Sequence, residues 1–160
     1  MIFFALNATL ALAWAALWGS FSYGNLLGGF VFGFAGLWFA RRLIDRDGEH
    51  QYFRTLPQSF VLVAYFLKEL TKSCVMVARD CIAREPRLHP AIVRFPIGRK
   101  SDPEIFLLAN LITLTPGTLT LDVAEDRSFL VIHSIYAKDP ESVIADLRAG
   151  MEHHVGRVFR

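Results

Sequence analysis

The stretch NLITLTPGTLTLDV (110–123) carries the sharpest change of pattern in the chain and decides how the C-terminal part folds. Pro116 cannot continue a helix, and Gly117 tolerates a positive φ, so an apolar helix should end here and the chain should reverse. The next six residues alternate between polar and apolar, which predicts a strand over 118–123. The side chains predicted to point inward are those of Leu119, Leu121 and Val123.

The threonines around this reversal have two interpretations. Thr113, Thr115 and Thr118 can bond backbone groups that the end of a helix leaves free. A catalytic alternative makes Thr115 a nucleophile with His133 as its base and Asp122 as the group that orients the base. We favour the structural interpretation, in which Thr115, Pro116, Gly117 and Thr118 form a structural motif.

The flanking segments extend the pattern into a small domain over 86–160. A strand is predicted at 90–98, and Pro96 confines it to an edge or an end. A helix begins at 101–104, with Ile105, Leu108, Ala109 and Ile112 as its buried face. After the 118–123 strand, an antiparallel partner follows at 129–137, and a last helix starts at 139–141 with Val143, Ile144 and Leu147 as its apolar stripe. The order β-α-β-β-α predicts an α+β domain with both helices on one face, close to a truncated ferredoxin-like unit.

The N-terminal end has a different chemistry. Residues 1–40 contain no Asp, Glu, Lys, Arg or His. A secretory signal would need a basic segment before its apolar run, so we do not expect cleavage. The segment 1–44 instead predicts a transmembrane helical hairpin, with spans Ile2–Trp18 and Leu26–Ala40 around the reversal at 19–25. Each span reaches only about 22–26 Å across a core of about 30 Å.

The flank RRLIDR (41–46) orients this hairpin, because arginines directly after a span hold that end in the cytoplasm. The spans carry small residues at helical spacing, which either pack the hairpin internally or leave a face for other membrane subunits. We favour the second use, because two short helices make a poor membrane domain alone. The small residues are Ala8, Ala11, Ala15 and Gly19 in the first span and Gly29, Gly33, Gly36 and Ala40 in the second.

A third helix is predicted over 56–85, with Pro57 in its first turn and Pro86 after its end. As a third span it would place Lys68, Glu69 and Lys72 at mid-depth in the bilayer, where charges are costly. As an amphipathic interfacial helix it would rest an apolar stripe among lipid headgroups. We favour the interfacial position, which leaves the domain at 86–160 in the cytoplasm.

Several classes of function are disfavoured. The net charge of +2 is too small to indicate nucleic-acid binding. No lysine follows Gly117 as a phosphate loop would require, and the adjacent His153 and His154 diverge on a helix, so neither a cofactor nor a metal site is predicted. Cys74 and Cys81 lie too far apart along one helix for a disulfide and are expected to be buried or lipid-facing.

The stretches NLITLTPGTLTLDV (110–123) and FLVIHSIYAKDPES (129–142), with FLKEL (66–70), resemble the E subunit of Mrp-type multisubunit cation/proton antiporters and of the related potassium-linked pH-adaptation systems. The resemblance covers nearly the whole chain. It implies a multi-pass subunit of a hetero-oligomer in a bacterial plasma membrane that exchanges Na⁺ or K⁺ for H⁺, with the ion-transfer machinery in larger subunits. It assigns no catalytic role to the Thr115–Thr118 motif.

We therefore predict a non-catalytic assembly subunit rather than an enzyme. Its partners would be the bilayer and sister membrane subunits. This agrees with the first two spans, which lack the ionisable groups that an ion path needs. The alternative is a membrane-anchored cytoplasmic binding or sensor module.

Overall fold

The N-terminal apolar segment forms two helices in the computed structural model, which describes residues 2–44, 51–98 and 100–159. Helix α1 covers Ile2–Leu17 and α2 covers Tyr23–Ile44. The intervening loop is shorter than predicted, because α2 begins at Tyr23 instead of Leu26. Arg46, part of the flank that orients the predicted hairpin, lies outside the described residues. The chain divides into two compact units, residues 1–56 and 57–160.

Helix α3 covers Gln51–Ile82, so the predicted range 56–85 is shifted toward the N-terminus. Pro57 lies inside this helix, and the expectation that it occupies the first turn is wrong. The turn before Pro57 is held by aromatic packing in unit 1, where Phe53 is buried against Phe3 and Leu37. This burial offsets the backbone hydrogen bond that a proline cannot donate.

Unit 2 contains the predicted order of strands and helices. Strand β1 (Ala91–Pro96) is followed by α4 (Asp102–Leu114), β2 (Thr118–Val123) and β3 (Phe129–Ser134). The chain then forms α5 (Pro140–Leu147), a π-helical turn η1 (Arg148–Glu152) and α6 (His153–Phe159). Helix α5 starts where the last helix was predicted to start, and the Asp139 carboxylate caps it by accepting a 3.2 Å hydrogen bond from the Glu141 amide. The helix at His153 and His154 was expected from the sequence, whereas the π-helical turn η1 was not predicted.

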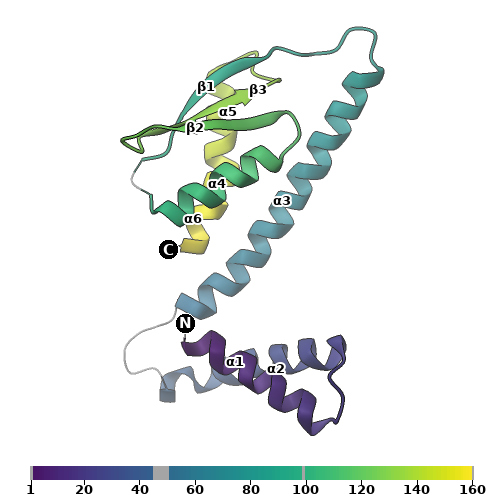
Figure 1. Ribbon diagram of the computed structural model, residues 1–160, viewed down its shortest axis with the longest axis vertical. Helices are drawn as coiled ribbons and strands as arrows, with labels where there is room; N and C mark the ends of the chain where they lie inside the picture. The colour runs from purple at the N-terminus through teal and green to yellow at the C-terminus, as the bar shows by residue number, and fades with distance from the viewer. Residues whose placement is uncertain (1, 45–50, 99, 160) are drawn as a thin grey trace. The chain divides into compact units, whose positions relative to one another are not determined.

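The sheet has the order β1-β3-β2, and both outer strands pair antiparallel with β3 (Figure 1). Strands β1 and β2 therefore run parallel to each other, and α4 connects them. Strand β1 lies at an edge of the sheet and Pro96 is its last residue, in agreement with the prediction that Pro96 confines the strand to an edge or an end. A bulge interrupts the β2 register between Thr120 and Asp122.

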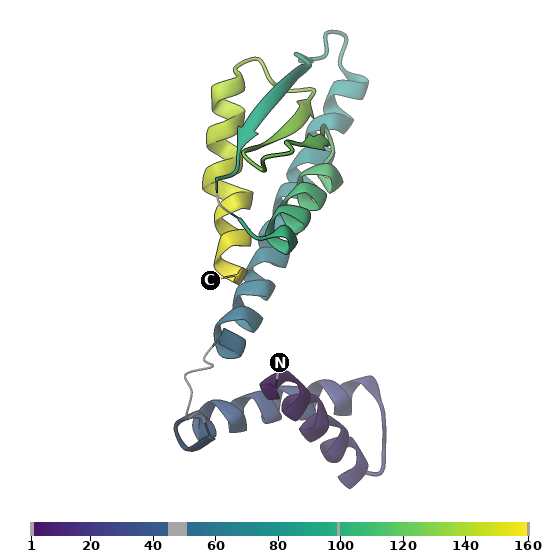
Figure 2. The same cartoon turned by 60° about the vertical axis from the view of Figure 1, so that its left-hand side comes forward.

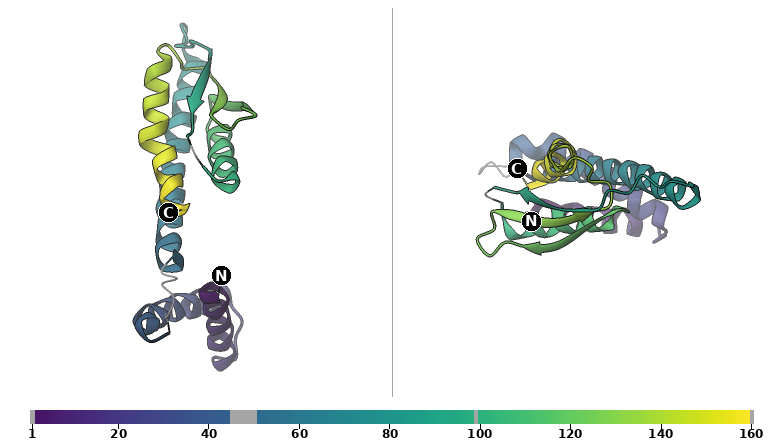
Figure 3. Two further views of the ribbon diagram at one scale, coloured as in Figure 1. Left: turned by 90° about the vertical axis from the view of Figure 1, so that its left-hand side faces the viewer. Right: turned by 90° about the horizontal axis from the view of Figure 1, so that it is seen from above.

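Helices cover one face of this sheet (Figure 3). Phe95, Leu130 and Ile132 are fully buried there, against Leu108 and Ile112 of α4. Met151 of η1 and Val155 of α6 complete the same core. Leu62 of α3 belongs to it as well, and Figure 2 shows α3 running alongside the domain. The part of α3 from Pro57 onward therefore belongs to the same compact unit as the sheet.

The opposite face of the sheet is open, and here the sequence prediction is wrong. Leu119, Leu121 and Val123 were expected to point inward, but they are 45%, 50% and 37% exposed. The helix-covered side of β2 instead carries Thr118 and Thr120, which bond the carbonyls of α4. Thr118 supplies a donor to a carbonyl in the last turn of α4, where intrahelical donors run out, and Thr120 reaches the Ala109 carbonyl further back in the helix.

Candidate functional site

The turn at Thr115–Thr118 closes α4 with side-chain hydrogen bonds. The Thr115 hydroxyl donates to the Leu111 carbonyl at 2.9 Å. The Thr118 hydroxyl lies 2.6 Å from the Ile112 carbonyl and 2.9 Å from the Thr115 carbonyl. These carbonyls are at the C-terminal end of the helix, where intrahelical donors run out. The bonds are of the kind that the sequence interpretation assigned to these threonines.

Gly117 has a φ of +94°, a conformation that strongly favours glycine. An added Cβ would lie 3.2 Å from atoms of Ile135 and Tyr136, so the position is also tightly packed. The Gly117 carbonyl accepts a 2.9 Å hydrogen bond from the Ile135 amide. The Pro-Gly pair thus aligns β2 beside β3 directly after the helix ends.

A groove of about 420 Å³ joins this turn to the charged part of α3. Lys68, Glu69 and Lys72 line it from α3, and Thr115 and Thr118 line it from the turn. The structure therefore brings together two groups of residues that the sequence singled out separately. The hydroxyls of both threonines already donate to carbonyls, and Lys72 pairs with Glu69 at 3.4 Å, so the groove has few free donors.

Thr115, His133 and Asp122 do not form the arrangement that the catalytic alternative requires. The Thr115 hydroxyl donates to a helix carbonyl, and an Asp122 carboxylate oxygen accepts from the Val123 amide at 2.8 Å. His133 pairs in register with Ile92 and Leu119 on the open face of the sheet. The three groups do not form the chain of hydrogen bonds that would activate a hydroxyl nucleophile.

The hairpin uses some of its small residues for its own packing. An added Cβ at Gly29 would lie 2.7 Å from Trp14 Cβ and 3.0 Å from Ala11 Cα. An added Cβ at Gly33 would overlap the amide oxygen of Asn7. Ala11 is buried at this contact, and Ala15, one turn further along α1, is fully buried as well. These four small residues therefore bring the α1 and α2 backbones close together.

The remaining small residues are differently placed. Gly36 is exposed and an added Cβ there would meet nothing within 4 Å. Gly19 is exposed in the reversal, where its φ is +62°. Ala8 and Ala40 are both half-buried. Gly36 is thus a surface position on α2 without a side chain, and the packing of the hairpin does not cover it.

Asn7 is a site residue that sequence reasoning missed. It is completely buried in unit 1, and its amide nitrogen donates a 2.8 Å hydrogen bond to the Tyr52 hydroxyl. This bond ties α1 to the first turn of α3. The signal was present in the sequence, because Asn7 is an isolated amide within an apolar run. Its partner could not be inferred, since Tyr52 is distant in sequence.

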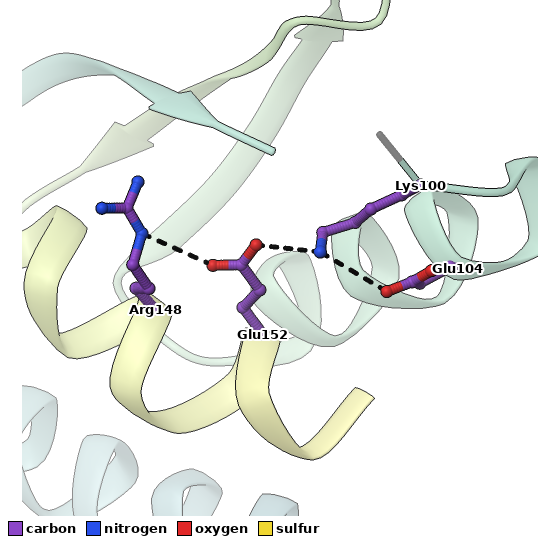
Figure 4. A network of polar contacts seen from close by, with 4 residues as sticks. All are labelled: Lys100, Glu104, Arg148 and Glu152. Carbon is purple, nitrogen blue, oxygen red and sulfur yellow. Dashed lines mark ion pairs between the residues drawn. The ribbon is translucent and has the colours of Figure 1, made fainter. Parts of the chain in front are cut away.

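A second missed feature is an ion-pair network across α4 and η1, shown in Figure 4. The Lys100 ammonium lies 2.9 Å from a Glu152 carboxylate oxygen and 3.4 Å from one of Glu104. Arg148 contacts the other Glu152 oxygen at 3.7 Å. The side chains of Lys100, Glu104 and Glu152 are only 9%, 13% and 15% exposed, so water screens their charges little. Nothing in the sequence indicates that residues 100 and 152 meet.

The remaining candidates for metal or redox chemistry are not clustered. In the described ranges, no group of three or more His, Cys, Asp or Glu could hold a metal ion. The His154 ring stacks on Tyr65 of α3 at 4.1 Å between centroids, and His153 is exposed. Cys74 and Cys81 are free thiols on the exposed side of α3, rather than buried in the protein.

Comparison with known proteins gives one consistent result. A family model described as Na+/H+ ion antiporter subunit matches residues 7–158. The E subunit of the Na(+)/H(+) antiporter of Bacillus subtilis is 35% identical over 97% of this chain and 96% of that protein. The corresponding E subunit of Alkalihalophilus pseudofirmus is 32% identical over 97% of this chain and 96% of that protein.

Two solved structures are also similar. A chain of the Mrp complex from Dietzia sp. is 34% identical, with a TM-score of 0.51, and the match covers 64% of this chain and 94% of that one. A chain of the membrane-bound sulfane sulfur reductase, an archaeal respiratory membrane complex, is 22% identical, with a TM-score of 0.55, over 99% of this chain and 98% of that one. The second likeness concerns the fold alone.

Proposed function

The chain belongs to the family of E subunits of Na+/H+ antiporters, and from this premise we propose that it is a non-catalytic assembly subunit of a multisubunit cation/proton antiporter. Other membrane subunits are its partners. The observation that carries the proposal is the chemistry of the hairpin: residues 1–40 contain no Asp, Glu, Lys, Arg or His. A cation or proton crossing a bilayer needs such groups or other strong polar ligands along its path.

The membrane arrangement follows from length and composition. Residues 23–40 of α2 are apolar and long enough to cross a bilayer, whereas Ile2–Leu17 is shorter. We propose that both helices cross the plasma membrane as a hairpin, with the short α1 supported by neighbouring subunits. The arginines at 41 and 42 place that end in the cytoplasm, and the C-terminal domain with it.

Helix α3 fits an interfacial position better than a third span. Leu62 is buried in the α+β core, and Tyr65 and Phe66 pack against the same core. A spanning α3 would therefore draw part of a polar domain into the hydrocarbon layer, where its charges are costly. The exposed Phe60, Val63 and Leu67 can face lipid headgroups and upper acyl chains instead.

The domain over 86–160 is proposed to be a ferredoxin-like unit that lacks its fourth strand. The order β1-β3-β2, with α4 connecting the two parallel outer strands, supports this relation. Its open face carries the exposed Ile92, Leu119 and Leu121. In a hetero-oligomer, this apolar face suits burial against a sister subunit on the cytoplasmic side.

The exposed Gly36 on α2 provides the test of the proposed assembly function. We expect Gly36→Leu to reduce the amount of sister subunits that co-purify with the tagged chain about tenfold, because a bulky side chain would block a close helix contact. The hairpin should stay intact, since an added Cβ meets nothing within 4 Å. Trp14 emission, recorded with Trp18 and Trp38 replaced by phenylalanine, reports the hairpin because Trp14 stacks on Phe32 of α2.

The same measurement separates the assembly role from the alternative of a membrane-anchored sensor module. A sensor module would purify as a small species without sister subunits, whether or not Gly36 is replaced. Recovery of the wild-type chain alone, under detergent conditions that preserve the other subunits as a complex, would contradict the assembly role.

A further inference from the structure

A second groove opens in unit 2, beside the C-terminal half of α3. Its volume is about 870 Å³. Helix α3, the loop after it and the segment after β3 all contribute to the lining. We name it the Arg79 groove and define it by Lys72, Val75, Met76, Arg79, Arg87 and Tyr136. Apart from Lys72, none of these residues was selected by the sequence analysis for a contact or a site.

One part of the Arg79 groove is apolar. Val75 is 51% exposed and Met76 is 37% exposed, one beside the other on α3. Their neighbour Ala83 lines the same groove and is also exposed. Apolar side chains that line a hollow and face water are suited to bind an apolar ligand. Methionine is especially adaptable in such a surface, because its side chain is flexible and polarizable.

The other part is cationic. Lys72 on α3, Arg79 about two helical turns further along and Arg87 in the following loop all line the groove. Within the described part of the chain, no carboxylate forms an ion pair with Arg79 or Arg87. The carboxylates of Asp80 and Glu85 also line the groove, and Lys72 is paired with Glu69 at 3.4 Å. One carboxylate oxygen of Asp80 accepts from the Arg87 backbone amide at 3.5 Å.

The wall formed by Tyr136 adds no further negative charge. Burial, followed by the nearby Asp80 carboxylate, raises the pKa of Tyr136 to about 12. The phenol therefore remains neutral at physiological pH. The groove thus combines an apolar strip with two arginines, Arg79 and Arg87, that form no ion pair within the described part of the chain.

We propose that the Arg79 groove binds an anionic phospholipid, with Arg79 and Arg87 on the headgroup phosphate and an acyl chain against Val75 and Met76. A guanidinium offers paired N–H donors that match two phosphate oxygens. A free phosphate would use the cationic end alone and leave the apolar strip in water. A phospholipid satisfies both parts, and α2 of the same chain is apolar and long enough to lie in a bilayer that supplies it.

The experiment measures lipid binding to the purified full-length chain in a mild detergent by native mass spectrometry. Phosphatidylglycerol is titrated against the wild type and against Arg79→Gln/Arg87→Gln. The double variant is expected to bind phosphatidylglycerol at least about tenfold more weakly, because two charged hydrogen-bonding groups are lost. Arg94→Gln/Arg127→Gln removes the same charge from the sheet and its hairpin turn and should bind like the wild type. Circular dichroism checks that both variants are folded.

Three outcomes would overturn the proposal. Equal weakening by the two double variants would mean that only overall charge attracts the lipid. Equal binding of phosphatidylcholine and phosphatidylglycerol would remove the role of the cationic end. Displacement of the lipid by an equal concentration of inorganic phosphate would assign the site to a free anion. A further variant, Val75→Asn/Met76→Gln, should weaken lipid binding, and unchanged binding would show that no acyl chain lies on the apolar strip.

Discussion

The double substitution Gly29→Ala/Gly33→Ala is expected to separate α1 from α2 and to lower the amount of chain in the antiporter complex at least about tenfold. The added methyl groups would overlap Trp14 and Ala11 at one position and the Asn7 amide at the other. Overpacking of this kind costs about 1–3 kcal/mol per site. Each increment of about 1.4 kcal/mol changes the equilibrium between free and assembled chain about tenfold. The two sites together are therefore enough to lower the amount of assembled chain at least about tenfold.

A matched pair of glycines on the same helix provides the control. An added Cβ at Gly24 or Gly28 meets nothing within 4 Å, so Gly24→Ala/Gly28→Ala should keep both the Trp14 emission and the co-purified subunits. Helix propensity changes in the same direction in both doubles, which leaves close packing as the difference between them. Equal behaviour of the two doubles would show that the hairpin does not depend on this contact.

The second large effect is expected from Lys100→Met. The substitution leaves the Glu104 and Glu152 carboxylates close together, with exposures of only 13% and 15%. Removing one partner of a buried ion pair costs about 3 kcal/mol. Native-state hydrogen exchange of peptides from α4 and α6, in the detergent-solubilised full chain, should show a corresponding loss of protection. Lys72→Met is the control, because its ion pair with Glu69 is 69% exposed on the lysine side and should contribute little.

A compensating variant tests the cause of this loss. Replacing Glu104 and Glu152 with glutamine in the Lys100→Met background removes the two carboxylates that contacted Lys100. This should restore most of the protection, because Arg148, which loses its contact with Glu152, is 57% exposed and stays hydrated. If the triple variant exchanges as fast as Lys100→Met, the lysine stabilises the domain through its aliphatic packing instead of its charge.

Much of the fold could be predicted because its signals are local. Pro116 and Gly117 ended α4, Asp139 and Pro140 began α5, and Pro96 confined β1 to an edge. Such residues restrict the backbone at their own position, whatever lies elsewhere in the structure. The start of α3 was misplaced because a proline is tolerated inside this helix, where aromatic packing stabilises the preceding turn.

The orientation of β2 could not be predicted from alternation alone. Alternation predicts that Leu119, Leu121 and Val123 share one face, but it does not say which face the helices cover. The bulge between Thr120 and Asp122 also breaks the alternation, so that Leu119 pairs with His133 on the open face whereas Val123 pairs with the buried Leu130. The helix-covered face instead carries Thr118 and Thr120, whose hydroxyls donate to the Ile112 and Ala109 carbonyls of α4. In a member of a larger assembly, an apolar face can serve a partner, so inward burial is not assured.

The candidate site was predictable in its parts but not in its assembly. The Thr115–Thr118 motif and the charged residues of α3 were both selected from the sequence, yet their shared groove depends on tertiary packing. The link between Asn7 and Tyr52 and the pairing of Lys100 with Glu152 join residues distant in sequence. Pairs of this kind leave no periodic or local signal.

The most direct test of the assembly role is cation-dependent proton movement in liposomes that contain the purified chain alone, with liposomes of the complete complex as the reference. We predict that addition of Na⁺ or K⁺ produces proton movement with the complex and none above empty liposomes with the isolated chain. Antiport by the isolated chain, at a rate comparable to that of the complex, would contradict the account.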